Sequence, residues 1–539
     1  MRVELPPISE AERTPLVEGL LAVIDLQPQR LRALEETVQQ LRDEVARLKG
    51  QTPRPTVAPS RLEAPPPAAV APAAKRPGSA KRQKNAQLVI HDEQWLPVAG
   101  APPGSVARGY EAFVVQELHV TAQVTRYGRQ RVETADGRTL LAPLPPEVLP
   151  GRHFGPGLIA FALHQHHHHG VTQPLLLEQL RQFGIDSSAG QVSRLLTEGT
   201  EPFHQEKEEL LPAGLAVSSY VGVDDTAARH QGRNGVCTAI GNDLFASFQS
   251  TDSKSRVNFL TVLQGSAPAY AVNDVARAYW EQQGLAQEWR ARLGAAGRSF
   301  ADEAAWQAWL RGQGLEGERP VRLATEGALL GGLIERGVSP GLVVLSDGAG
   351  QFDVLRHASC WVHAERPLAR LVPYSEAHRQ AIAFVRDQVW ELYKDLKLYQ
   401  RHPAGGGRRS LEYRFDFLVS QPTDFPSIRA VLGQMRAHKA DLLRVLERPE
   451  VPLHNNGTES DSREYVKKRK ISGGTRSALG RRCRDTFASL KKTCRKLGVC
   501  FWSYLRDRLC GRGQIPRLSA LLRQRAEERA AEKVQAVPT

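Results

Sequence analysis

The sequence predicts a multidomain α/β protein whose largest domain is a mixed sheet flanked by helices. Three observations support this class. Short apolar segments typical of buried strands occur within 218–249 and 341–346. Helical periodicity returns between and after them, with Gly and Ser near the expected helix ends. A chain of 539 residues, of which 41% are hydrophobic, can form several domains and bury at least one large core.

The first predicted element is a coiled coil at residues 15–50. Its apolar residues alternate at spacings of three and four with charged residues between them, which forms a heptad seam of Leu31, Leu34, Val38, Leu41, Val45 and Leu48. We therefore expect self-association into a homodimer or a higher oligomer. The alternative is a short helix packed on its own domain, because the seam is short for a coiled coil.

A linker and a small β domain come next. Residues 51–93 are rich in Pro and Ala and cannot bury a core, so their basic side chains are either solvated or in contact with phosphates. Residues 94–150 are predicted to form a small β domain. Within them, 110–143 alternate like antiparallel strands, with turn signals at Tyr127-Gly128 and Asp136-Gly137.

Residues 151–210 predict a helical, helix-turn-helix-like domain that binds DNA. Gly184 ends one helix, and Ser187 or Ser188 can cap the next. A plain helical hairpin fits the pattern equally well. The histidine-rich run 164–169 suggests a metal site, but neighbouring helical positions point in different directions and few of them could share one ion. We expect a polar, partly exposed helix end.

Two predicted strands end in aspartates. The apolar segment before Asp224 and Asp225 is followed by two further strand patterns, which is the opening of a ribonuclease-H-like sheet. A second apolar run stops at Asp347, which Gly348 follows. An aspartate at the end of a central strand can hold a divalent metal in a site open to substrate. The alternative is that each acidic residue merely ends its strand in solvent.

A third carboxylate is predicted near the start of a helix. Asn455 or Asn456 can cap this helix, and Glu459 and two basic residues, Arg463 and Lys467, then share one face. A dense basic stretch continues through the helix and is the best candidate for binding DNA phosphates: Arg463, Lys467, Lys468, Arg469, Lys470 and Arg476. The alternative is a solvated helical face.

The bulk composition agrees with a polyanionic partner. Lys and Arg number 72 against 58 Asp and Glu, which gives a net charge of +14. The six cysteines form no C-x-x-C pair, so a zinc ribbon is not expected. We also expect no signal peptide, no membrane span and no membrane partner. These features predict a cytoplasmic protein that associates with the nucleoid when it binds DNA.

Taken together, these segments resemble the insertion sequence 66 family of transposases. The resemblance lies in V-D-D-T at 223–226, S-D-G-A-G-Q-F at 346–352, C-W-V-H-A-E-R at 360–366 and N-N-G-T-E-S at 455–460, followed by S-R-E-Y-V-K-K-R-K and S-G-G. It continues into L-K-K-T-C-R-K-L-G-V-C-F-W-S-Y-L-R-D-R-L and extends upstream to the N-terminal coiled coil, so that it covers most of the chain.

The resemblance implies a DDE active site in a ribonuclease-H-like domain at 215–510, followed by a charged tail at 511–539. The catalytic and metal-binding triad would be Asp224, Asp347 and Glu459, and two Mg²⁺ (or Mn²⁺) ions are expected. His363 would position a water or a phosphate or simply pack. Asp225, Asn455 and Asn456 are further supporting candidates.

The sequence also departs from the family pattern. The family's cysteine-rich zinc element is missing, His454 stands where the family often has Asp, and Ser460 stands where Arg is usual. Residues 264–338 resemble an extra insertion, whereas a helical insertion at 375–450 is typical of the family.

The resemblance implies metal-dependent cleavage and strand transfer on double-stranded DNA, at the terminal inverted repeats of an insertion sequence and at a target. Two alternatives are a related nuclease without strand transfer and a non-catalytic DNA-binding protein that descends from a transposase.

Overall fold

The computed structural model describes residues 88–535 apart from 107, 146–147, 149–150, 152, 266, 295–296 and 404, and also Val17 and Val38. Apart from Val17 and Val38, the predicted coiled coil lies outside the described residues, as does most of the predicted linker. The chain divides into two compact units, Gln40–Val124 and the remainder. No helix among the described residues is long and apolar enough to cross a membrane.

The predicted small β domain is reduced to one hairpin. β1 (Arg131–Glu133) pairs antiparallel with β2 (Thr139–Leu141) around the expected Asp136-Gly137 turn. The strands expected from 110 to 130 are not found: these described residues are neither strand nor helix. Their large apolar side chains, including Phe113, are exposed. Alternation alone does not stabilise a strand that has no surface against which to bury one face.

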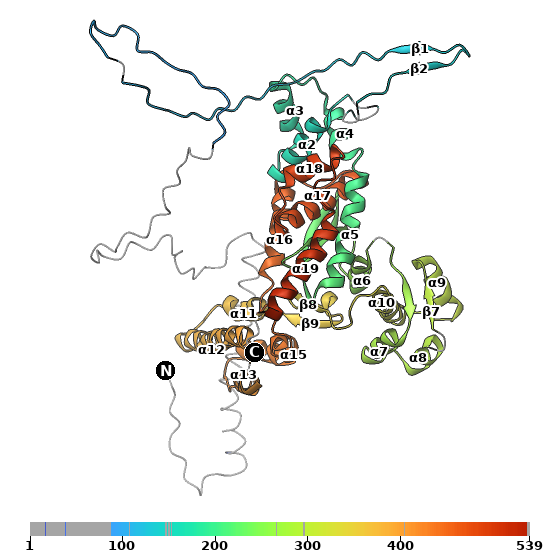
Figure 1. Ribbon diagram of the computed structural model, residues 1–539. Coiled ribbons are helices and arrows are strands. Elements are labelled where there is room, and N and C mark those ends of the chain that lie inside the picture. Colours follow the sequence, from blue (N-terminus) through green and yellow to red (C-terminus); the bar gives the residue numbers. More distant parts are fainter. Residues whose placement is uncertain are drawn as a thin grey trace. The chain divides into compact units, whose positions relative to one another are not determined.

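The larger unit contains a five-stranded mixed sheet in the order β5-β4-β3-β8-β9, of which Figure 1 labels β8 and β9. Its strands are β3 (Tyr220–His230), β4 (Arg233–Gly241), β5 (Ala246–Thr251), β8 (Val343–Ser346) and β9 (Arg356–Ser359). The first three are antiparallel, whereas β3, β8 and β9 are parallel. This arrangement confirms the predicted mixed α/β class. Gln231 and Gly232 both have positive φ, as the tight hairpin between β3 and β4 requires.

One helix supplies hydrogen-bond acceptors to the backbone amides of the edge strand β5. α17 (Ala478–Lys496) presents three polar side chains at intervals of four residues to alternate backbone amides of β5. The amide of Ser250 donates to Asp485 at 2.7 Å, that of Phe248 to Ser489 at 2.9 Å, and that of Ala246 to Thr493 at 3.2 Å, all of them buried. These hydrogen bonds occupy donors that an edge strand otherwise leaves unpaired.

Two insertions interrupt the sheet domain. The first lies between β5 and β8 and buries Tyr270, Trp280 and Trp306. It comprises α6 (Arg256–Gln264), β6 (Tyr270–Val272), α7 (Asp274–Gln282), α8 (Gln287–Gly294), β7 (Arg298–Phe300), α9 (Glu303–Gly312) and α10 (Glu318–Glu335).

The second insertion is helical and has its own apolar cluster, to which Trp361 also contributes. It follows α11 (Trp361–Arg370) and comprises α12 (Glu376–Arg401), α13 (Gly405–Val419), α14 (Pro426–Ala437), α15 (Lys439–Leu442) and the 3-10 turn η4 (Arg444–Leu446). The chain then enters α16 (Asn456–Ser472).

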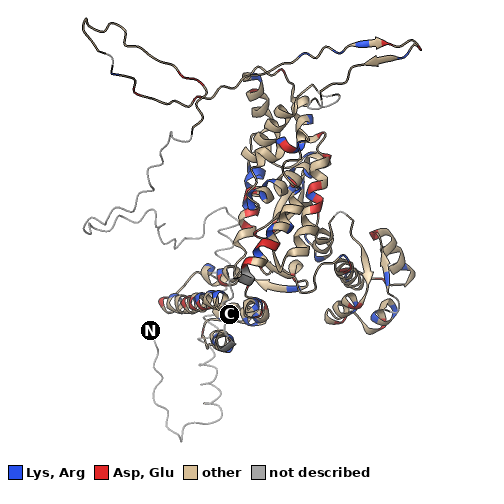
Figure 2. Ribbon diagram, viewed as in Figure 1, with Lys and Arg blue, Asp and Glu red and all other residues tan. Residues whose placement is uncertain are grey.

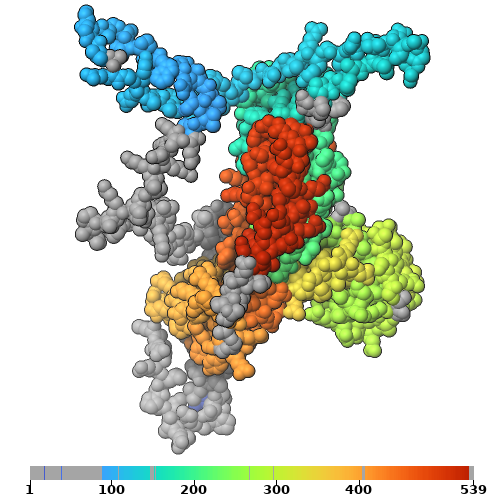
Figure 3. Space-filling model, in the orientation of Figure 1, coloured from blue at the N-terminus to red at the C-terminus, as the bar shows by residue number. Residues whose placement is uncertain are grey.

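The N-terminal helices of the larger unit pack with the closing helices. They are α2 (Pro156–His164), η2 (Gln165–His169), α3 (Gln173–Gln182), α4 (Ala189–Thr197) and α5 (Glu201–Val217), with α18 (Phe501–Leu509) against α2 and α19 (Leu518–Gln535) along α5. Figure 3 shows the C-terminal residues, in red, beside green residues of this region. Gly184 takes a positive φ between α3 and α4, and Ser188 caps α4 as predicted.

The histidine run forms a π-helical turn and is not a simple exposed helix end. His168 and His169 are exposed, but the His167 ring stacks on Phe487 of α17 with a centroid distance of 4.3 Å. Burial lowers the pKa of His164 and of His166 to about 4. It lowers the pKa of His167 further below its ordinary value. Neutral imidazoles are therefore part of the packing between η2 and α17.

Candidate active site

Three carboxylates reach one region from three elements. Asp224 lies within β3, Asp347 follows directly after β8, and Glu459 lies in the first turn of α16. The parallel register pairs Gly222 of β3 with Leu345 of β8. Two residues further along each strand are Asp224 and Asp347, so these aspartates lie on the same face of neighbouring strands.

α16 approaches β3 closely, which brings Glu459 to Asp224. The Asn455 amide donates to the Val223 carbonyl at 2.7 Å. A β-carbon added at Gly222 would stand 2.2 Å from Oγ1 of Thr458, so only glycine allows this approach. Asn455 occupies the N-cap position predicted for it, but its side chain does not cap the helix. It anchors the helix to the strand instead, while Asn456 is exposed.

The charges of neighbouring carboxylates act on Asp224. Burial raises the pKa of Asp224, and the negative charges of Glu459, Asp347 and Asp225 raise it further. Oε1 of Glu459 is buried and has no hydrogen-bond partner among the described residues. A cluster of anionic oxygens that repel one another, one of them unpartnered, suits a divalent cation with oxygen ligands.

Asp225 has a different environment from Asp224, because successive strand residues point to opposite faces. Its carboxylate accepts hydrogen bonds from Thr238 at 2.6 Å and from Gln351 at 3.1 Å. Burial raises the pKa of Asp225 as well. Both carboxylate oxygens therefore have protein donors, which leaves Asp224 as the aspartate of this pair that faces Glu459.

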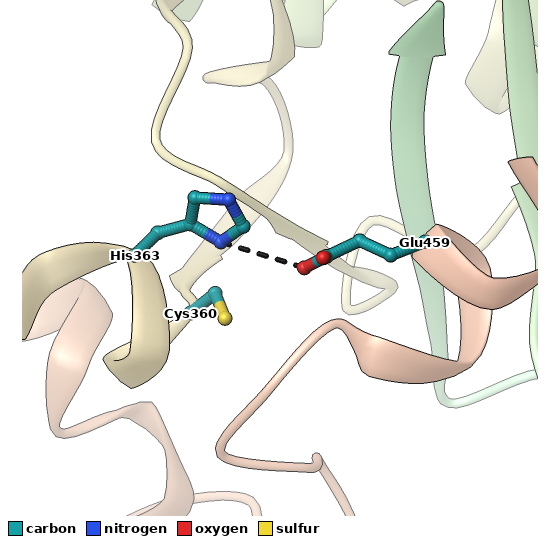
Figure 4. A group of neighbouring side chains, drawn as sticks. All are labelled: Cys360, His363 and Glu459. Carbon is teal, nitrogen blue, oxygen red and sulfur yellow. Dashed lines mark ion pairs between the residues drawn. The ribbon is translucent and has the colours of Figure 1, made fainter. Parts of the chain in front are cut away.

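A histidine and a cysteine lie beside Glu459. Figure 4 shows the His363 ring of α11 and the Glu459 carboxylate pointing toward each other, with the Cys360 sulfur close by. Nδ1 of His363 is 3.5 Å from Oε1 of Glu459. The three potential ligand atoms all lie within 4.8 Å of one another. Cys360 Sγ accepts the Asn455 backbone amide at 3.3 Å, and burial raises the pKa of this thiol.

The predicted DNA-binding residues divide into two groups. The exposed group lies on the protein surface and consists of Arg463, Lys467, Lys470 and Arg476. In contrast, Lys468 donates to the His166 carbonyl at 2.6 Å, and Arg469 donates to the Ala227 carbonyl. Burial lowers the pKa of Lys468 to about 7. Figure 2 shows basic residues along α16 and α17, but these two side chains serve internal hydrogen bonds.

A cleft of about 740 Å³ is lined by residues of β3, β8, α16 and α17. Gly222 and Leu345 line it, and each precedes an aspartate by two residues. Three exposed basic residues of α16 and α17 also line it, namely Arg463, Lys467 and Arg495. The cleft therefore combines positive charge with acidic side chains of its own, while the three carboxylates lie outside its lining.

Some residues that shape the site were not predicted from the sequence. Gln351 binds Asp225, and the Arg366 guanidinium donates to Nε2 of His363 at 2.7 Å. Asp461 of α16 forms ion pairs with Lys492 at 3.3 Å and Lys496 at 2.5 Å. Part of the basic stretch therefore joins α16 to α17. The available signal was the spacing of four residues between Lys492 and Lys496, which places both on one face.

Comparison with known proteins gives two matches. Residues 343–482 match the family described as Transposase IS66 family. This segment contains Asp347, Cys360, His363 and Glu459. A protein of Sinorhizobium fredii named "Uncharacterized protein y4jO" is 41% identical over 321 residues, which are 59% of this chain and 100% of that protein.

Proposed function

The chain belongs to the IS66 family of transposases, and on this premise we propose that it cuts and joins DNA at the ends of an insertion sequence with a DDE active site. The observation that carries the proposal is the convergence of Asp224, Asp347 and Glu459 from β3, β8 and α16. Three carboxylates on separate elements are the usual ligand set for two-metal phosphoryl transfer.

The proposed fold of this domain is ribonuclease-H-like. Two features support it: three antiparallel strands followed by two parallel ones, and an aspartate on the central strand β3. The two insertions then lie in connections outside the sheet, so they leave its strand order intact.

We propose that the triad holds two Mg²⁺ (or Mn²⁺) ions. The residues fit such ions, because the carboxylates are oxygen donors whose negative charges repel one another. When bound, the ions would activate a water or a 3′-hydroxyl and stabilise the leaving oxygen. The protein would supply the framework: Gly222 and Asn455 hold α16 against β3, so Glu459 is positioned before metal arrives.

The proposed partner is double-stranded DNA, at the element ends and at a target. The cleft lined by Arg463, Lys467 and Arg495 would take the DNA backbone, and its lining includes residues of the two strands that lead to the aspartates. Positive side chains near an acidic metal site can neutralise the flanking phosphates of the DNA, while the metal neutralises the phosphate that reacts. The proposal retains the homodimer or higher oligomer expected from the heptad seam at 15–50.

The deciding experiment is cleavage and joining of a DNA fragment that carries the ends flanking the gene. Wild-type protein and Asp347→Ala would be compared with Mg²⁺, with Mn²⁺ and with EDTA. Joined products that need metal and disappear in the variant are the expected result. Cleavage without joining would favour the nuclease alternative. Tight DNA binding without metal-dependent chemistry would favour a non-catalytic DNA-binding protein.

A further inference from the structure

A short chain of polar contacts leads from the surface of α11 to the candidate active site. Arg366, His363 and Glu459 follow one another, with the Arg366 guanidinium 2.7 Å from Nε2 of His363 and Nδ1 of His363 3.5 Å from Oε1 of Glu459. The His363 and Glu459 side chains are 16% and 15% exposed, so water competes little for their facing atoms.

The contact with Arg366 determines the tautomer of His363. A guanidinium can only donate, so Nε2 of His363 must accept and therefore carries no proton. The proton of the neutral ring is then on Nδ1, which faces Glu459. Neither of these two buried atoms has a hydrogen-bond partner within the described part of the chain, and they lie 3.5 Å from each other. The ring therefore presents a single donor to a single unpartnered carboxylate oxygen.

The second oxygen of Glu459 is oriented differently. Oε2 lies 3.8 Å from the guanidinium of Arg463, which is one turn further along α16 and exposed. A carboxylate fixed through Oε1 would leave Oε2 free to bind an ion. This is the orientation that a carboxylate needs to bind one ion with one oxygen, and groups bonded to such ligands commonly set their geometry.

We propose that His363 is a positioning residue for Glu459, that it acts through an Nδ1–H bond to Oε1, and that Arg366 holds it in the required tautomer. The inference rests on the proposed function, since it assigns a role within the same metal site. The role is carried by the contacts between α11, which holds His363 and Arg366, and α16, which holds Glu459.

The same atoms invite a different interpretation, namely a zinc site formed by Cys360, His363 and Glu459. The hydrogen bonds oppose it. A metal on Nδ1 would require a proton on Nε2, which would then face the Arg366 donor with no acceptor between them.

The test uses amide substitutions that place a donor at one ring position or the other. His363→Asn puts an N–H close to the position of Nδ1, whereas His363→Gln puts it near Nε2, and His363→Ala removes it. The affinity of each full-length protein for Mn²⁺ would be measured by electron paramagnetic resonance or calorimetry, beside DNA cleavage. We expect His363→Ala and His363→Gln to weaken Mn²⁺ binding about 10-fold and His363→Asn to recover most of the loss.

Arg366→Met tests the tautomer, with Arg370→Met as the matched control on the same helix, because Arg370 is exposed. We expect weaker Mn²⁺ binding for Arg366→Met alone. The inference would be overturned if the wild-type protein bound Mn²⁺ and cut DNA while all His363 variants kept its Mn²⁺ affinity. The proposed function would then still stand. The inference would also be overturned if the wild-type protein contained stoichiometric zinc and both His363→Ala and Cys360→Ser lost it. A wild type that binds no Mn²⁺ and cuts no DNA would overturn the proposed function, and the inference with it.

Discussion

The two neighbouring aspartates of β3, Asp224 and Asp225, have different environments in this structure. Asp224 has a half-buried carboxylate whose pKa is raised by burial and then by three negative neighbours, Glu459, Asp347 and Asp225. Asp225 points away and is held by Thr238 and Gln351. Without a cation, the repulsion around Asp224 opposes folding, as is common where a site is built for a ligand that the protein alone does not supply.

Asp224→Asn should therefore separate stability from activity. Removing the charge relieves burial and repulsion, so we expect the metal-free protein to gain about 1 kcal/mol of unfolding free energy after allowance for solvent screening. Metal-dependent DNA cleavage should fall below detection, because an amide is a poor metal ligand. Denaturant unfolding in EDTA and the cleavage assay measure the two effects.

Asp225→Asn is the matched control. It removes an acceptor that the Gln351 amide uses, so we expect no gain in stability, and cleavage should persist. Equal behaviour of the two variants in both assays would show that the assignment of Asp224 over Asp225 is wrong.

At the scale of elements, the contact of α17 with β5 is a ladder of side-chain hydrogen bonds along a sheet edge. Thr493, at one end of the ladder, is fully buried and bonds both the amide and the carbonyl of Ala246 at 3.2 Å. Thr493→Val keeps the volume and removes the hydroxyl, so we expect a loss of about 2 kcal/mol from unpaired backbone groups.

Thr493→Ser is the comparison for this ladder, because it keeps the hydroxyl and loses one methyl group. We expect it to cost about 1 kcal/mol, less than the valine variant. Urea unfolding of both variants decides the question. A valine variant as stable as wild type would mean that the side-chain ladder does not stabilise the edge of the sheet.

The π-helical turn η2 should make folding sensitive to acid. The folded-state pKa of His166 is about 4 against an ordinary value of 6.5, and that of His167 is also lowered by burial. Above pH 6.5 both states are neutral and the packing contributes fully. As the pH falls from 6.5 toward 4, the unfolded chain takes up protons first, so stability is lost over this window.

Two substitutions in the histidine-rich run 164–169 can show which histidine causes the loss of stability in acid. His167→Leu keeps an apolar side chain against Phe487 and cannot titrate, so its stability should fall less steeply between pH 6.5 and 4. The difference is at most about 1.4 kcal/mol per pH unit for one proton. The control is His169→Leu, since His169 is exposed. Thermal unfolding across this pH range would refute the prediction if wild type and His167→Leu lost stability in parallel.

The elements differ in how far the sequence could predict them. The strands before Asp224 and Asp347 could be predicted because the signal for a buried strand, a continuous apolar run, lies within the strand's own residues. Strand β9 was missed, since its buried His357 is satisfied by Ser346 at 2.8 Å and Asp441 at 3.1 Å, which lie elsewhere in the sequence. The anchoring role of Asn455 was missed for the same reason: its partner, Val223, is distant in the chain.

At the scale of the whole molecule, the net charge of +14 predicts DNA binding that weakens with salt, but only some basic residues can contribute to it. The sequence could not separate Lys467 from Lys468, because adjacent lysines have the same composition and charge. The structure separates them: Lys467 is exposed and lines the cleft between α16 and α17, whereas Lys468 lies inward against the η2 turn. The useful quantity is therefore the number of phosphate contacts and not the total charge.

The two lysines give a direct test of that distinction. Lys467→Gln should reduce the slope of log K against log salt concentration by about 1, since it removes one phosphate contact. Lys468→Gln should leave the slope unchanged, because its ammonium group donates to the His166 carbonyl and does not face DNA. Binding of both variants to a fragment carrying the element ends, titrated from low to physiological salt, provides the slopes. Equal decreases for the two variants would mean that Lys468 leaves its internal site when DNA binds, and η2 would then belong to the DNA-binding surface.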